Sequence, residues 1–260
     1  MARGAPGHAR ERAGLRRQKL SCASQSTASG RGPERTLLCL ALFLFAIALT
    51  APALGHGVGE RDGSFLAGSD GLALGPFFYL GAKHMFTGTD HLLFLAGVIF
   101  FLYRLRDVAI YVTLFAVGHS ITLILGVLAD LQVDAHLVDA VIGLSVVYKA
   151  FDNLRGFESL GWRIDPRRAV FGFGLIHGLG LATKLQPYGL SGEGLVANML
   201  SFNVGVEAGQ FAALALILIF FQWWRASGRF ERHARLANWT LMVAGFVLFG
   251  MQMAGFLAQA

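Results

Sequence analysis

Two histidines and an aspartate stand at the head of a long apolar segment, in the octet His84-Met-Phe-Thr-Gly-Thr-Asp90-His91. Imidazole and carboxylate groups are ligands that divalent transition metals accept in proteins. A charged side chain inside a bilayer costs roughly 2.5–3.5 kcal/mol on insertion scales. If this segment spans a membrane, Asp90 needs a partner, a water-filled cavity or a bound cation. The octet therefore raises the hypothesis of a metal site inside a membrane.

Three more polar residues, His119, His177 and Glu207, fall near the middle of other apolar segments. A lone membrane histidine is more often a hydrogen-bond partner between helices than a ligand, and a protonated Glu207 bonded to an asparagine is an open alternative. Several such residues near the midplane are harder to explain as structural contacts alone. The predicted metal ligands are His84, Asp90, His91, His119, His177 and Glu207, with His84 at the entrance of a polar path.

The seven-residue spacing of His84 and His91 limits how they can bind an ion. On a straight helix they share a face but lie roughly 10 Å apart along the axis. Two ligands of one ion need nitrogens within about 4 Å of each other, because metal–nitrogen bonds are about 2.1 Å long. Either the two histidines bind in succession, or the helix opens at Thr87-Gly88-Thr89, where unwound backbone is tolerated if it lines a cavity. Asp90 would then ligate the ion itself or orient a histidine of a neighbouring helix.

The elements that must position these residues are helices that span a membrane. The chain is 55% hydrophobic and 15% charged, whereas a soluble domain is about 25% charged. Its apolar residues come in blocks of about 20, the length that crosses a bilayer as a helix. The composition predicts an all-α, polytopic transmembrane helical bundle of about six spanning helices. The expected segments are 76–103, 107–130, 136–153, 168–186, 194–223 and 237–258.

The N-terminal part has the character of a targeting segment. Residues 1–35 contain eight of the 22 Lys and Arg and two of the 16 Asp and Glu, so the net charge of +6 belongs to this part and predicts no nucleic-acid binding. The apolar run Leu37–Leu49 and the small-x-small motif Ala51-Pro52-Ala53 follow, as in a signal peptide. The expected organisation is a basic tail plus signal at 1–53, a short exported Gly-rich segment at 54–75 and a six-helix transmembrane domain at 76–260. An uncleaved first helix is the alternative for residues 1–53.

Both cysteines, Cys22 and Cys39, lie in this N-terminal part. The predicted mature chain has no thiolate ligand and no disulfide. Any metal site must therefore be built from nitrogen and oxygen atoms.

The distribution of basic residues between the segments predicts an orientation. Arginines occur in linkers 104–106, 155–168 and 225–235, whereas 131–135 and 187–192 contain no Lys or Arg. Because Lys and Arg accumulate in cytoplasmic loops, the mature N- and C-termini are predicted to face outward.

The motifs around the polar residues resemble one family. The first segment reads His84-Met85-x-x-Gly88-x-Asp90-His91, close to the family signature His-Pro-x-x-Gly-x-Asp-His, and Val117-Gly-His119-Ser, His177-Gly178 and Asn203-Val-Gly-Val-Glu207 are similar. Over about 75–258 the chain resembles the HupE/UreJ membrane proteins, accessory proteins of hydrogenase and urease. The resemblance implies a nickel or cobalt permease of the bacterial inner membrane.

Three residues depart from the family pattern. Met85 replaces the proline of the signature. Well-described permeases of the family carry His-Gly-x-Ala-His-Gly-x-Glu in a later helix, and here Leu181 replaces its second histidine and Lys184 its glutamate. These replacements put the identity of the metal in question more than family membership.

The leading hypothesis is an inner-membrane permease for a divalent transition metal, with Ni²⁺ as the first candidate and Co²⁺ as the second. The ion would be cargo, and we expect no permanently bound cofactor. The sequence has no Gly-x-x-x-x-Gly-Lys-Ser/Thr motif, so ATP would not drive the chain directly. The expected partners are the metal ion and the lipid bilayer, with metalloenzyme maturation proteins as a further candidate.

Two other classes of function stay open. One is a non-transporting membrane accessory protein for the assembly of a hydrogenase- or urease-type metalloenzyme. The other is a membrane protein that binds haem or another cofactor through its histidines. An enzyme is not expected. An intramembrane hydrolase in particular is not indicated, because Ser120 and His119 are adjacent on one helix and point apart, so they cannot form a nucleophile–base pair.

Overall fold

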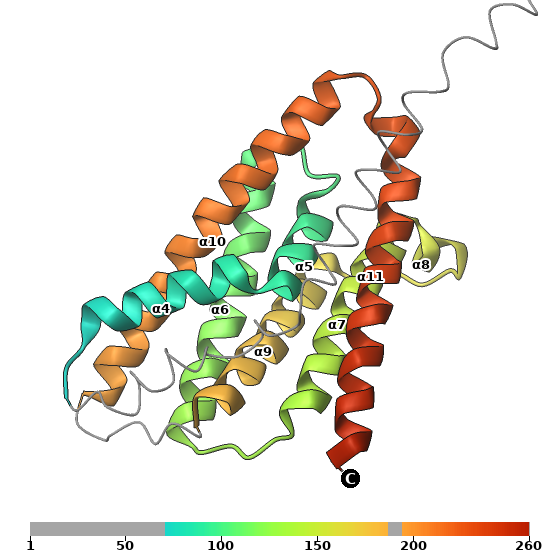
Figure 1. Cartoon of the computed structure of the whole chain (residues 1–260). Helices are drawn as coiled ribbons and strands as arrows, with labels where there is room; N and C mark the ends of the chain where they lie inside the picture. The colour runs from blue at the N-terminus through green and yellow to red at the C-terminus, as the bar shows by residue number, and fades with distance from the viewer. Residues whose placement is uncertain (1–70, 187–193, 260) are drawn as a thin grey trace, which may run out of the picture. The chain divides into compact units, whose positions relative to one another are not determined.

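A computed structural model describes residues 71–186 and 194–259, which form eight helices and no strand (Figure 1). The all-α prediction is thereby confirmed. The predicted signal region 1–53 and most of the exported segment 54–75 lie outside the described residues. The helices are α4 (Leu74–Thr87), α5 (Thr89–Ile99), α6 (Leu105–Leu128), α7 (Ala135–Asn153), α8 (Gly156–Ser159), α9 (Pro166–Leu185), α10 (Leu195–Ala226) and α11 (Phe230–Gln259).

The predicted apolar segments correspond to these helices with one difference. Segments two to six each form one long helix, namely α6, α7, α9, α10 and α11, and the single-turn α8 lies in the linker between α7 and α9. The first segment forms two helices, α4 and α5, which meet at Gly88. The opening considered for this segment is therefore present in the structure.

By length and composition, three of the described helices can each cross a bilayer: α6, α10 and α11. α5 is apolar but only 11 residues long, and α7 and α9 have 19 and 20 residues. The chain is a multi-pass helical membrane protein, and six crossings stay a prediction.

The side chains are distributed as expected for a protein surrounded by lipid. Large apolar residues such as Leu125, Phe211 and Val243 are exposed on the outer faces of the long helices, whereas Asp90 and His177 are buried inside the bundle. An apolar exterior lets the bundle contact hydrocarbon. The polar interior contains the groups that are expensive to expose to lipid.

The helices pack most extensively in three pairs: α4 with α10, α6 with α9, and α7 with α11. In Figure 1, α7 and α11 run side by side, as do α6 and α9. Glycines permit each close approach, because a Cβ on Gly81 would collide with the Phe202 carbonyl, one on Gly178 with the His119 carbonyl, and one on Gly143 with the Phe249 backbone nitrogen. Small residues at crossing points are typical of membrane helix packing.

For two of these helices, the glycine pattern of the sequence predicts a packing that the structure contradicts. The pairs Gly174/Gly178 and Gly205/Gly209 suggest from sequence that α9 and α10 pack against each other. Instead Gly174 and Gly178 contact α6, and Gly205 and Gly209 contact α4. A glycine pair shows which face of a helix is small, but the neighbour that fills this face depends on the arrangement of the other helices.

Aspartate side chains cap the N-termini of α7 and α9. The Asp134 carboxylate accepts the Leu137 amide at the start of α7, and the Asp165 carboxylate accepts the Arg167 amide at the start of α9. Pro166 takes the first position of α9, where no backbone donor is required. Such caps typically stabilise a helix by about 1 kcal/mol.

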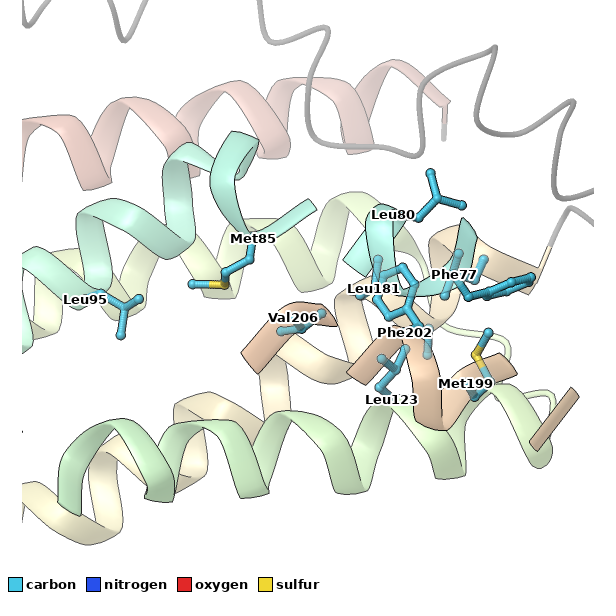
Figure 2. Close-up of a cluster of buried hydrophobic side chains, with 11 residues drawn as sticks. Phe77, Leu80, Met85, Leu95, Leu123, Leu181, Met199, Phe202 and Val206 are labelled. Carbon is cyan, nitrogen blue, oxygen red and sulfur yellow. The ribbon is translucent and has the colours of Figure 1, made fainter. Parts of the chain in front are cut away.

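A cluster of buried apolar side chains joins α4 and α5 to α6, α9 and α10 (Figure 2). Phe77, Leu80 and Met85 of α4 pack there with Leu123 of α6, Leu181 of α9 and Phe202 of α10. Met85 and Leu181, two of the three departures from the family pattern, are thus core residues in this chain, 0% and 2% exposed.

Candidate metal site

The site is built around the break between α4 and α5. α4 ends where the Gly88 amide donates to the His84 carbonyl at 2.9 Å, and Gly88 is extended, with φ −71° and ψ 96°. A Cβ at this position would lie 3.0 Å from His91 Nδ1 and 3.3 Å from the nearer Asp90 oxygen. Glycine therefore leaves room for the Asp90 and His91 side chains beside the unwound backbone.

The break draws together histidines that a straight helix would separate. The ring centroids of His84 and His91 are 5.2 Å apart. The His91 ring also lies 4.7 Å from that of His177 on α9 and 5.9 Å from that of His119 on α6. We call these four residues the histidine cluster. Because metal–nitrogen bonds are about 2.1 Å long, two imidazoles that share one ion have ring centroids about 4.5–5.2 Å apart. The pairs His84/His91 and His91/His177 have separations in this range.

His91 is oriented by the residue before it. Its Nδ1 lies 3.0 Å from Asp90 Oδ1, which also accepts the His91 backbone amide at 2.9 Å. An ionised carboxylate only accepts hydrogen bonds, so Nδ1 carries the proton and Nε2 presents a lone pair. A carboxylate that orients a histidine in this way is typical of metal-binding imidazoles. The Nε2 atom is buried and has no hydrogen-bond partner among the described residues.

His177 is oriented by Ser145 of α7. The Ser145 hydroxyl donates to the Ile142 carbonyl at 2.6 Å, so it accepts from His177 Nε2, which lies 3.2 Å away. The proton of a neutral His177 is then on Nε2, and Nδ1 presents the lone pair. This Nδ1 is also buried without a partner in the described part of the chain. Sequence reasoning missed Ser145, because nothing in the sequence shows that α7 and α9 bring these two side chains together.

A small cavity lies where these helices meet. Its lining comprises His84, Gly88, Asp90 and His91 from α4, α5 and their junction, Asp139 and Ile142 from α7, and His177, Gly180, Leu181 and Lys184 from α9. Four of the six predicted site residues therefore line one cavity. All three departures from the family pattern lie at or next to it, since Leu181 and Lys184 line it and Met85 directly follows His84.

Asp139 lies near the start of the third apolar segment, where the sequence favours ordinary helix-end solvation over a role in attracting cations. In the structure Asp139 is only 7% exposed and lines the cavity. One feature of the sequence could have indicated this position. Asp139, Ile142 and Ser145 recur every three residues, so they fall on one side of a helix.

His119 is placed beside the cavity and not on its lining. It is 1% exposed, it stacks on Phe115 at 6.2 Å between ring centroids, and neither ring nitrogen has a partner among the described residues. It contacts the site through His91.

The structure does not bring Glu207 to the histidines. Its side chain is exposed and does not line the cavity. The buried face of α10 is centred on Phe202, Val206 and Ala213, with Asn203 near its margin. Glu207 lies about 40° further around the helix than Asn203, which places it outside this face.

The side chains do not form a finished coordination sphere. Within residues 71–186 and 194–259, no group of three or more His, Cys, Asp or Glu side chains is spaced to hold a metal ion as it stands. The arrangement is a set of buried imidazoles with unpaired nitrogens beside a carboxylate.

Comparison with known proteins identifies the chain over most of its length. The family model described as HupE / UreJ protein matches residues 60–260, which include every helix of the described structure. The resemblance found in the motifs is thereby confirmed. No curated protein and no solved structure matches the chain.

Proposed function

The chain belongs to the HupE/UreJ family, a family of membrane accessory and transport proteins, and on this premise we propose that it is a permease for a divalent transition-metal ion. Ni²⁺ is the leading candidate for the cargo and Co²⁺ the second. The proposal includes a location in a bacterial inner membrane with the mature N- and C-termini in the periplasm. It rests on the charge asymmetry of the linkers and on the family.

One observation carries the proposal: unpaired imidazole nitrogens are buried in the lining of one cavity and directly beside it. Within the described residues they are His84 Nε2, His91 Nε2, both nitrogens of His119 and His177 Nδ1. A buried polar group without a partner costs about 1–3 kcal/mol. Four helices place such groups in the interior of the bundle. Binding of a passing ion would give these nitrogens a partner and offset the cost of burying them.

The proposed path follows the order of these residues from the break inward. The hydrated ion meets His84 first, since His84 is only partly buried, and exchanges water for imidazole there. It then binds His91, where Asp90 supplies negative charge and holds the ring. His177 and His119 accept the ion next. An inside-negative potential assists the entry of a 2+ ion by about 4.6 kcal/mol per 100 mV.

Uptake of ⁶³Ni²⁺ by cells that lack other nickel importers tests this function. Expression of the wild-type chain should raise accumulation, and His91→Ala and Asp90→Asn should return it to the level of cells without the chain. His136→Ala is the matched control, because His136 is a partly buried histidine that pairs with Gln252 outside the cavity. If the His91→Ala and Asp90→Asn chains accumulate as much ⁶³Ni²⁺ as wild type at equal abundance, the permease function is wrong.

A second function, a non-transporting accessory protein in metalloenzyme assembly, has one observation in its favour. Lys184 places a fixed cation in the cavity, where it would oppose the passage of a metal ion. In that case the cluster is structural, and His91→Ala should lower the abundance of the protein while ⁶³Ni²⁺ accumulation does not depend on the chain at all. An absorption spectrum of the purified protein tests the haem alternative, which requires a Soret band.

A further inference from the structure

An ion pair occupies one end of the cavity. Lys184 Nζ, from the last turn of α9, lies 2.7 Å from Asp139 Oδ2 and 2.9 Å from Asp139 Oδ1 on α7. The two side chains are 17% and 8% exposed. Both line the same cavity as His84, Asp90 and His91. The ammonium thus contacts both oxygens of a carboxylate that lines the same cavity as three of the histidines.

The ion pair changes the net charge of the cavity lining. With neutral histidines, the lining contains two carboxylates, Asp90 and Asp139, and one cation, Lys184. Without the ammonium the cavity would carry two negative charges, which matches a divalent ion. With it, the cavity carries one, and the Asp139 oxygens are held by Nζ.

We propose that Asp139 is a further metal-binding carboxylate and that Lys184 is its tethered counter-cation, which an incoming divalent ion displaces. The inference deepens the permease function and rests on it. The unpartnered, buried nitrogens of His91 and His177 are the independent sign that a ligand enters this cavity.

The lysine lowers the resting affinity of the site without removing a ligand. Its ammonium is a compact charge on a flexible stem, so it can leave Asp139 when a metal arrives and return when the metal departs. A transport site must bind an ion strongly enough to admit it and weakly enough to release it. The returning ammonium weakens the binding of the ion to Asp139 and so favours its release.

Calorimetric titration of the purified full-length chain with Ni²⁺ in detergent tests the inference. Lys184→Met should raise the affinity about tenfold or more, because it removes a unit charge that competes for Asp139 at contact distance. Adding Asp139→Asn to Lys184→Met should cancel this gain. In cells, Lys184→Met should make ⁶³Ni²⁺ uptake saturate at lower Ni²⁺ but with a lower maximal rate, since release is slower.

The matched control is Lys149→Met. Lys149 is a partly buried lysine whose Nζ lies 2.6 Å from Asp152 Oδ2, and neither residue lines the cavity. Its loss should leave Ni²⁺ affinity unchanged. A gain of affinity in both lysine variants would mean that any loss of positive charge has the effect, and the specific role of Lys184 would be wrong.

The outcomes separate this inference from the permease function. If His91→Ala binds Ni²⁺ as tightly as wild type, or wild type binds none, the permease function fails and the inference fails with it. If His91→Ala loses binding while Lys184→Met binds as wild type, only the inference is overturned. A Lys184→Met protein that melts earlier, with the double variant restored in stability and Ni²⁺ affinity unchanged throughout, identifies a structural ion pair instead.

If the Lys184→Met protein does not accumulate, the same Ni²⁺ titration is made on Lys184→Arg. Arginine keeps the positive charge but binds a carboxylate more firmly, because its guanidinium donates two parallel N–H hydrogen bonds. It should therefore be harder to displace, and Ni²⁺ affinity should fall severalfold. An affinity equal to that of wild type overturns the inference.

Discussion

Two groups of buried polar side chains in this bundle are paired to very different extents. Near the other end of α5 from the cavity, Asn153 donates through Nδ2 to the Gly97 carbonyl at 2.9 Å and to Asn238 Oδ1 at 2.8 Å. Asn238 in turn donates to the Ala234 carbonyl at 2.9 Å. In the histidine cluster, several fully buried nitrogens have no partner within the described residues.

The difference separates a structural contact from a binding site. Both groups avoid lipid, and both would be costly if their atoms were left without partners. The asparagine contact meets its hydrogen-bonding needs within the protein and joins α7 to α5 and α11. The cluster meets them only in part, through Asp90 and Ser145, and leaves the lone pairs suited to a metal.

Replacement of His91 should have the largest effect on binding. His91→Ala removes the ring at the centre of the cluster, and Ni²⁺ affinity should fall about 100-fold or more, since loss of a residue that merely orients a ligand already costs about 10–100-fold. Calorimetry on the purified protein measures this. The His136→Ala protein should retain the affinity of wild type, and a His91→Ala protein that also retains it would remove the distinction drawn between the two groups.

Replacement of Asn238 should affect stability and not binding. Asn238→Leu deprives the Asn153 amide of one acceptor and places an apolar side chain beside it. We expect a loss of about 1–3 kcal/mol in the free energy of unfolding, with unchanged Ni²⁺ affinity. Thermal unfolding in detergent with and without Ni²⁺ measures both quantities. A loss of Ni²⁺ affinity at retained stability would show that the asparagine contact serves the site.

The smallest effect is expected for His119→Phe. Phenylalanine keeps the stacking on Phe115 but removes two buried nitrogens without partners. The free energy of unfolding should stay level or rise by about 1 kcal/mol, the opposite direction from Asn238→Leu. ⁶³Ni²⁺ uptake should slow even so, because the ion loses one acceptor on its path. A clearly destabilised His119→Phe protein would indicate that His119 is a structural residue like Asn238.

Much of the fold and of the site can be predicted from the sequence. The apolar blocks predict the long helices in their order, and Gly88 between Thr87 and Thr89 marks the opening found between α4 and α5. The residue types at 84, 90, 91, 119 and 177 predict a polar interior built from imidazole and carboxylate groups. These inferences succeed because hydrophobic length, helix-breaking residues and ligand chemistry are properties of local sequence.

Other features follow from the way the helices cross. Periodicity fixes where a side chain lies around its own helix axis, but not which neighbour that side faces. For this reason Glu207, which shares a sequence pattern with Asn203, lies outside the site, whereas Asp139 and Ser145 join it. The same reason explains why the glycines of α9 contact α6 and those of α10 contact α4. The burial of histidine nitrogens without partners, the cavity and the Lys184–Asp139 ion pair arise only once α4, α5, α7 and α9 have packed together.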